Sequence, residues 1–366
     1  MAPSGERRLI SADDHIDIHS MPKDLWQKRL PKRFRERGPR VVETDDGPFW
    51  QTEGRLFSPY GRKEAGLLAA ENFGFRPSQP EERIKDLDAD GVYAQVIYAP
   101  STVALQFQDG ELKLACLEAY NDWAVEFNRY DRNRLIALPD IASNDPEAAA
   151  AELTRCIAAG HRGASVSGTA GAIAKGIAPI FAQSWQRFWD IASEAKLPIH
   201  VHLAGGLHTL QYVPGSWSFP AMASIVPMQL DEILAGMVFS GILEQRPEMP
   251  FILAETGLGW LPYALERMDY ELHKYGDKIL DHRIEMLPSE IFRRQVLVTY
   301  QDERFGVECI PRIGVENVMW ASDYPHGDTT WPESHKAIDE SPLATLGAEA
   351  FRKVTYENAA RIYGIE

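Results

Sequence analysis

Cysteine and positive charge are both scarce in this sequence. The three cysteines, Cys116, Cys156 and Cys309, lie far apart in a chain of 366 residues. This spacing gives neither a disulfide framework nor a CxxC metal site, so we expect buried free thiols. Lysine and arginine number 38 against 53 aspartates and glutamates, a net charge of −15. Because binding to a phosphate backbone needs clustered cations, the composition argues against a nucleic-acid partner.

Long apolar runs are also missing. No segment offers the roughly 18 uninterrupted apolar residues of a membrane span. The first residues, MAPSGERRLISADD, contain no apolar signal-peptide core. We therefore expect a cytoplasmic protein without a membrane partner. A hydrophobic content of 45% with 25% charged residues is ordinary for a folded chain, and the composition favours an enzyme that acts on a small molecule.

Short apolar, β-branched runs alternate with longer amphipathic segments, a pattern typical of parallel strands joined by crossover helices. Eight strands with helices between them predict an α/β fold, a closed (β/α)8 barrel that occupies residues 1–366 as a single domain. The predicted strands are 8–17, 92–99, 135–142, 163–168, 198–204, 250–256, 295–301 and 317–323. The predicted helices are 81–90, 111–129, 146–159, 179–195, 221–245, 260–275, 304–312, 332–340 and 345–363.

Two stretches of the sequence are longer than the loops of a minimal barrel. Residues 20–80 would form a long insertion after the first strand, and residues 205–220 a long loop after the fifth. Both follow the carboxyl ends of strands, where barrels build their active sites, so we expect a substrate lid. A contact between the two copies of a homodimer is the alternative.

The first predicted strand carries polar residues on one face. Alternate side chains of a strand share a face, so Asp13, His15, Asp17 and, beyond them, His19 point one way while Asp14 points the other. Burying such groups unpaired is costly, and a divalent cation would offset the cost. The pattern therefore predicts metal ligands, with a solvated strand end as the alternative.

Metal-competent side chains also end three later strands. His200 and His202 share a face of the fifth strand, where we expect one to be a ligand and the other a neighbour. Glu255 ends the sixth strand and Asp323 the eighth, and both are candidate ligands. His326 follows as a ligand or proton carrier, or as a loop histidine that only forms hydrogen bonds. His200, Glu255 and His326 are the candidates for acid–base catalysis.

At these positions the sequence resembles the amidohydrolase-related family of metal-dependent barrels, which contains small-molecule hydrolases and non-oxidative decarboxylases. The resemblance extends from ISADDHIDIH through LPIHVHLAGG and RPEMPFILAETGLGWLPYALERMD to NVMWASDYPHGDTTWP. It implies first-strand ligands at Asp13 and His15, a fifth-strand ligand at His202 and an eighth-strand ligand at Asp323.

Two departures from this family bear on the metal. Its decarboxylases and hydrolases usually carry a histidine where this chain has Glu255, and the predicted fourth strand, GASVSG, lacks the lysine whose carbamate bridges two metals in binuclear hydrolases. The ligand set is then larger than one zinc needs and suits iron or manganese. It comprises Asp13, Asp17, Glu255 and Asp323 with His15, His202 and either His200 or His326. In this respect the sequence is similar to the barrel-type non-heme diiron monooxygenases.

Two functions follow from the resemblance. The favoured hypothesis is a monooxygenase in which two irons and an external electron donor hydroxylate a bulky apolar carboxylic acid, or its CoA thioester, with O2. The alternative is a hydrolase or non-oxidative decarboxylase of a small carboxylic acid, with one zinc or manganese and with Glu255 as general acid or base. Aromatic residues that either pack in the core or form the pocket wall are Trp217, Phe219, Trp260 and Tyr324.

Overall fold

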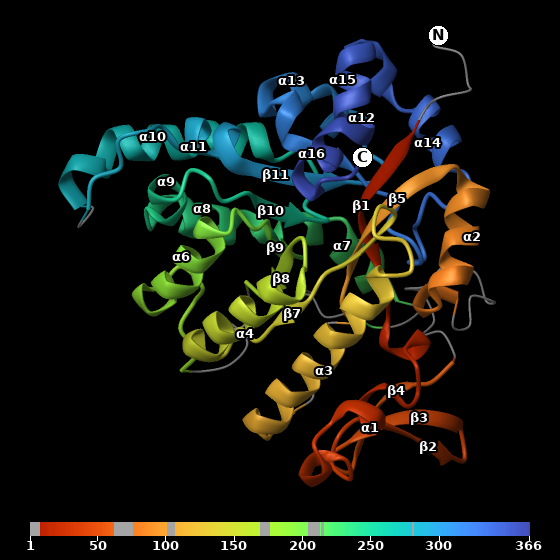
Figure 1. Ribbon diagram of the computed structural model, residues 1–366. Coiled ribbons are helices and arrows are strands. Elements are labelled where there is room, and N and C mark those ends of the chain that lie inside the picture. Colours follow the sequence, from red (N-terminus) through yellow and green to blue (C-terminus); the bar gives the residue numbers. More distant parts are fainter. Residues whose placement is uncertain are drawn as a thin grey trace.

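A ring of parallel strands forms the centre of the computed structural model (Figure 1). The structure describes residues 8–61, 76–100, 107–168, 176–203, 213, 216–279 and 282–366. Its barrel strands are β1 (Leu9–His15), β5 (Val92–Tyr98), β6 (Leu135–Ala137) continued by β7 (Asp140–Ile141), β8 (Ala164–Val166), β9 (Ile199–His202), β10 (Phe251–Ala254), β11 (Val296–Tyr300) and β12 (Val318–Trp320). The eight predicted strand positions are therefore all occupied.

The ring closes through hydrogen bonds between strand neighbours. Strand order runs β1-β5-β6 in one sheet and β12-β11-β10-β9-β8-β7 in the other. The predicted strand 135–142 divides at Pro139, which has no N–H to donate, so β6 pairs with β5 and β7 pairs with β8. The chain leaving β12 returns to β1, because the His15 N–H donates to Tyr324 O at 2.7 Å and the Asp323 N–H to Asp13 O at 3.0 Å. The predicted barrel is thereby confirmed.

Helices surround the strands (Figure 1). The α-helices are α1 (Leu25–Arg29), α2 (Pro80–Asp90), α3 (Gly110–Asn128), α4 (Pro146–Ala159), α6 (Gln186–Glu194), α7 (Ser218–Ala223), α8 (Asp231–Phe239), α9 (Ile242–Gln245), α10 (Leu261–Ile279), α11 (Pro288–Gln295), α12 (Arg304–Glu308), α13 (Ile310–Ile313), α14 (Ser334–Glu340), α15 (Ala348–Arg352) and α16 (Asn358–Tyr363). Short 3-10 helices are η1 (Ile18–Ser20), η2 (Lys32–Phe34), η3 (Arg76–Ser78), η4 (Gln183–Trp185), η5 (Val226–Leu230), η6 (Val315–Asn317) and η7 (Pro342–Leu346), and η8 (Lys353–Glu357) is a π-helix.

Local sequence explains where helices begin and end. Helix α4 starts where the Asp145 carboxylate accepts hydrogen bonds from two backbone N–H groups, with Pro146 in the first turn, and it ends at Gly160 with φ of 92°. The predicted helix 221–245 is instead divided into α7, η5, α8 and α9. Pro227 lies in the first turn of η5, and Gly241 adopts a φ of 75° between α8 and α9, so neither position continues a regular helix.

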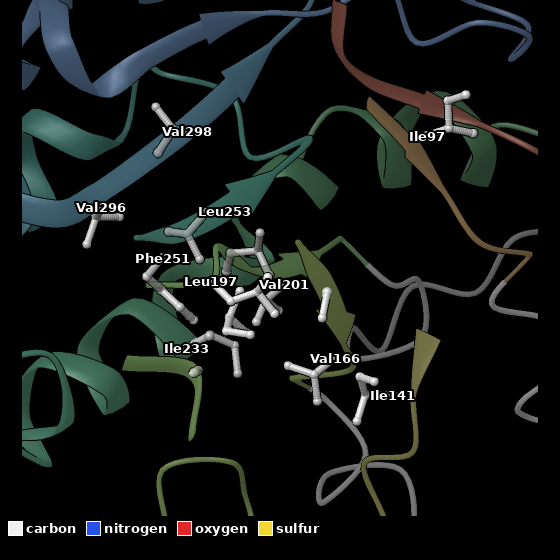
Figure 2. Packing of buried hydrophobic residues seen from close by; sticks show 14 of the residues in the cluster. Ile97, Ile141, Val166, Leu197, Val201, Ile233, Phe251, Leu253, Val296 and Val298 are labelled. Atoms are coloured by element: carbon white, nitrogen blue, oxygen red, sulfur yellow. The ribbon is translucent and has the colours of Figure 1, made fainter. Parts of the chain in front are cut away.

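Alternate residues of the barrel strands fill two separate cores. One set packs outward against the helices, and Figure 2 shows part of it, including Val201, Leu253 and Val298. The other set points into the barrel and meets Tyr363 of α16, so the C-terminal helix fills the amino-terminal end of the barrel. The carboxyl ends of the strands are left to build a site.

The insertion after β1 forms a small antiparallel sheet at one side of the barrel, beside α1 and one end of α3 (Figure 1). Its strands are β2 (Arg40–Thr44), β3 (Gly47–Thr52) and β4 (Arg55–Pro59). Side chains fix it in place, since the Trp50 indole N–H donates to Ile18 O at 2.8 Å and the Trp26 indole N–H to Cys116 O at 3.0 Å. Residues 62–75, and most of the predicted loop 205–220, lie outside the described part of the chain. The lid, the homodimer contact and the single domain stay predictions.

One helical stretch among the described residues, Ser218–Phe239, is long and apolar enough to cross a membrane by length and composition alone. Core helices pass the same test. The buried face of α8 packs in the outer core through Ile233, Leu234, Met237 and Val238. The stretch is therefore only weak evidence for a membrane span. The cytoplasmic location stays a prediction.

Candidate metal centre

Side chains from the carboxyl ends of β1, β9, β10 and β12 converge at one point. The Nε2 atom of His15 lies 3.5 Å from Asp13 Oδ1 and 3.1 Å from Asp323 Oδ1. The Nε2 atom of His202 lies 3.4 Å from the same Asp13 oxygen and 3.3 Å from Glu255 Oε2. Five of the predicted site residues thus share one cluster, although they come from four strands.

The cluster contains buried polar atoms that do not satisfy one another. Asp13 Oδ1, the Nε2 atoms of His15 and His202, and both carboxylate oxygens of Asp323 form no hydrogen bond with any described residue. Ligand atoms of Asp13, His15 and His202 all lie within 4.8 Å of one another, and so do those of His15, Asp323 and His326. Buried polar atoms without partners are costly, so this set of carboxylate and imidazole donors fits a divalent cation.

The imidazole of His202 is already oriented as a ligand. Its Nδ1 atom lies 2.6 Å from the carbonyl oxygen of Leu203. A carbonyl only accepts, so Nδ1 carries a proton and donates. In the neutral ring the lone pair is then on Nε2, the atom that faces Asp13.

Local backbone irregularities direct three acidic side chains towards the cluster. The pairing of β1 with β5 shifts register between Ser11 and Asp14. Ala12 points into the barrel, yet Asp13 also reaches the cluster, as a β-bulge allows. Glu255 and Asp323 follow their strands in the left-handed conformation, with φ of 53° and 60°. Non-glycine residues rarely adopt this conformation, and it recurs at functional sites.

Asp14 faces away from the cluster, as the alternation of β1 predicts. Its Oδ1 accepts hydrogen bonds from the Ser322 hydroxyl at 2.6 Å and the Tyr324 N–H at 2.7 Å. Burial raises the pKa of Asp14 to about 8, against the opposing influence of Arg83. The carboxyl is therefore protonated near neutral pH. Its hydrogen bonds connect β1 to the segment after β12.

His326 lies between two carboxylates at the edge of the cluster. Its ring stacks on His15, and its Nδ1 atom is 2.9 Å from Asp323 Oδ1. On the other side its Nε2 atom is 3.7 Å from Asp17 Oδ1. The predicted strand 8–17 ends at His15, so Asp17 is in the following turn and meets the cluster at His326. His19 belongs to the adjacent η1, outside the two groups of candidate ligand atoms.

Charge and burial set the protonation of the ion-free cluster. Burial lowers the pKa of His15. Burial also disfavours the charged form of His202, but the Asp13 carboxylate outweighs it and raises the pKa of His202 to about 9. Burial, followed by the charge of Asp323, raises the pKa of Glu255 to about 8. Burial opposes ionisation of Asp323 as well, yet His326 and His15 hold the pKa of Asp323 well below its usual range.

His200 lies deeper in the barrel than His202. Its Nδ1 atom is 2.7 Å from the Tyr98 hydroxyl, and its Nε2 atom is 3.5 Å from the Tyr363 hydroxyl. Burial lowers the pKa of His200 to about 3, so the ring is neutral. His202 is therefore the member of the pair that joins the cluster, and a catalytic role for His200 stays a prediction. Tyr98, whose ring centroid is 4.7 Å from that of His202, was missed, although it is the last residue of β5.

The four predicted pocket aromatics are placed differently from one another. Tyr324 is fully buried and donates its hydroxyl proton to Asp86 at 2.6 Å, and the Trp260 indole N–H donates to Thr256 O at 2.8 Å. Both placements fit core packing, the alternative given above. Phe219 is half-buried and Trp217 is 74% exposed.

A family model described as amidohydrolase matches residues 25–365. The chain belongs to the amidohydrolase family. This membership and the closed barrel agree with the resemblance noted in the sequence.

Individual relatives of this amidohydrolase are distant. A gamma-resorcylate decarboxylase of Rhizobium radiobacter is 22% identical over 311 residues, which are 78% of this chain and 87% of the relative. The crystal structure of an amidohydrolase from Mycobacterium avium subsp. paratuberculosis K-10 has a TM-score of 0.74 at 19% identity and covers 98% of both chains. A dihydroxybenzoic acid decarboxylase of Polaromonas sp. JS666, with bound manganese and an inhibitor, has a TM-score of 0.67 at 14% identity, again over 98% of both chains.

These relatives bear on the two hypotheses drawn from the sequence. Two of the three are decarboxylases, and one of them contains manganese. The comparisons thus support the alternative hypothesis better than the diiron monooxygenase. The two irons, the CoA thioester and the external electron donor of the favoured hypothesis stay without support.

Proposed function

We propose that this amidohydrolase is a metal-dependent, non-oxidative decarboxylase of a hydroxylated aromatic carboxylic acid. The observation that carries the proposal is a pair of adjoining groups of buried potential ligand atoms that share His15, one with Asp13 and His202 and the other with Asp323 and His326. The decarboxylase relatives support the reaction class and the aromatic acid, and the Polaromonas structure supports manganese.

Four residues would hold one ion, namely Asp13, His15, His202 and Asp323. Their two carboxylates and two imidazoles suit manganese or zinc. When bound, the metal supplies a Lewis acid that neutralises and orients an anionic substrate beside these ligands. His326 stacks on His15 and contacts Asp323, so it fixes the orientation of both side chains.

Glu255 would handle the proton in this reaction. Decarboxylation breaks the bond between the ring carbon and the carboxylate, releases CO2 and places a proton on that carbon. A donor that still holds a proton at neutral pH is therefore needed. The Glu255 side chain is two-thirds buried, with 34% of its surface exposed, and burial followed by the charge of Asp323 raises its pKa to about 8 while no ion is bound. It occupies the position where related enzymes usually carry a histidine.

Anaerobic turnover tests this proposal directly. Metal-stripped protein is loaded with one equivalent of Mn²⁺ and mixed with a panel of mono- and dihydroxybenzoates under nitrogen, and CO2 release is measured. We expect release of one CO2 per phenol formed, without oxygen. Activity that requires O2 and about two irons per chain would reject the proposal and restore the monooxygenase. Absence of turnover on the whole panel would reject the substrate class.

A further inference from the structure

A single hydroxyl group connects two residues of the cluster. Thr299, on the barrel-facing side of β11, is fully buried. Its Oγ1 atom lies 2.7 Å from Asp13 Oδ2 and 2.7 Å from the backbone nitrogen of Glu255. Asp13 and Glu255 belong to different strands, so this hydroxyl links the first strand to the turn after the sixth.

The direction of both hydrogen bonds is fixed by chemistry. The Glu255 N–H can only donate, so the Thr299 oxygen accepts that bond. The hydroxyl has one proton, and the Asp13 carboxylate is an acceptor, so the proton is donated to Asp13. Valine has the same shape but can form neither bond, whereas serine can form both.

These two bonds determine what each partner presents to the cluster. Because Asp13 Oδ2 is occupied by Thr299, its other oxygen, Oδ1, is the one that faces His15 and His202 without a hydrogen bond. The bond to Glu255 satisfies a backbone N–H in a left-handed turn that the residue would otherwise rarely adopt. One side chain thus orients a carboxylate and secures the turn that carries a second one.

We propose that Thr299 is a positioning residue of the metal centre. Its hydroxyl holds Asp13 with one oxygen directed at the ion, and it fixes the Glu255 turn beside that oxygen. The inference rests on the proposed metal site. A purely structural role is the competing explanation, in which the hydroxyl only satisfies two buried polar groups and the ion does not depend on it.

The test compares full-length, metal-stripped variants by calorimetric titration with Mn²⁺. For Thr299→Val we expect a dissociation constant about 10–100-fold above that of the parent, the range typical of groups that orient metal ligands. Thr299→Ser should bind as the parent does. The matched control is Thr355→Val, which removes a buried hydroxyl that donates to Phe351 O in the C-terminal segment, and it should leave Mn²⁺ binding unchanged.

The outcomes separate this inference from the proposed function. Parental affinity in a folded Thr299→Val variant would overturn the inference and leave the metal centre standing. Failure of the parent to bind Mn²⁺ would instead overturn the proposed function. If Thr299→Val does not fold, Thr299→Ala is compared with Thr299→Ser in the same titration. The thermal unfolding of each ion-free variant is recorded, because a structural role lowers the unfolding temperature of the ion-free protein without changing Mn²⁺ affinity.

Discussion

The rings of His15 and His326 stack with centroids 3.9 Å apart and planes inclined by 22°. His15 ends the first barrel strand and His326 follows the last one. The contact therefore joins the first and last strands of the barrel beside the candidate metal site. His326 also bridges Asp323 and Asp17. In the proposed site with one ion, we expect this imidazole to orient His15 and Asp323 and not to bind the ion itself.

His326→Phe separates these roles. Phenylalanine keeps the stacking surface on His15 but removes both ring nitrogens. We expect the metal content to stay near one ion per chain and the affinity for Mn²⁺ to fall by about tenfold, as for loss of a supporting partner. Metal analysis after dialysis gives the stoichiometry. A parent with two ions and a variant with one would show instead that His326 is a ligand of a second ion.

Replacing the two neighbouring acids of β1 by asparagine should affect Mn²⁺ binding differently. Asp13→Asn should weaken Mn²⁺ binding by more than about 100-fold, beyond the range of outer-shell partners. Asp14→Asn should retain the metal, because Asp14 faces away and its carboxyl, with a pKa of about 8, is already neutral near pH 7. Titration calorimetry on both variants measures the difference. Equal losses would contradict the orientation of this strand.

Much of this arrangement could be predicted from the sequence because it depends on local patterns. The alternation of side chains separates Asp13 and His15 from Asp14, although the register of β1 shifts between Ser11 and Asp14. The same alternation places both His200 and His202 inside the barrel. The alternation does not say, however, how deep in the barrel each histidine lies. The hydrogen bonds of His200 to tyrosines of β5 and α16 depend on how distant segments pack.

Other features depend on backbone geometry or tertiary contacts that a single sequence does not contain. The left-handed turns at Glu255 and Asp323 are unusual for acidic residues and are stabilised by partners elsewhere in the barrel. Thr299 is 286 positions from Asp13, and nothing in VLVTY marks its hydroxyl as important. Pro139 could have indicated the break in the third strand, because proline cannot donate to a sheet.

Metal binding should release a proton from His202. Burial disfavours its charged form, but Asp13 raises the pKa of His202 to about 9, so the ion-free ring is protonated at pH 7. An imidazole must be neutral to bind a metal, so the apparent affinity should rise by about tenfold per pH unit below pH 9. Calorimetry in buffers of different ionisation enthalpy counts the protons released. An affinity that is constant from pH 6.5 to 8.5 would contradict this account.

His200 should matter for stability and not for the metal. Replacing it with leucine leaves the buried Tyr98 hydroxyl without its partner, which costs about 1–3 kcal/mol of unfolding free energy. Denaturant unfolding measures this loss, and Mn²⁺ titration should give the parental stoichiometry. The matched variant His202→Leu should lose the metal. Loss of metal in His200→Leu would restore the predicted functional role of His200.

Glu255→Gln distinguishes a proton donor from a metal ligand. The amide keeps the size of the side chain and can still form hydrogen bonds, but it cannot transfer a proton to carbon. We expect Mn²⁺ stoichiometry to stay at one while turnover falls by about 10²–10⁴-fold, the usual contribution of a general acid. Glu255→His, which restores the group common in related enzymes, should recover part of the activity. A fall in metal content in Glu255→Gln would show that this carboxylate binds an ion, because its Oε2 already lies 3.3 Å from His202.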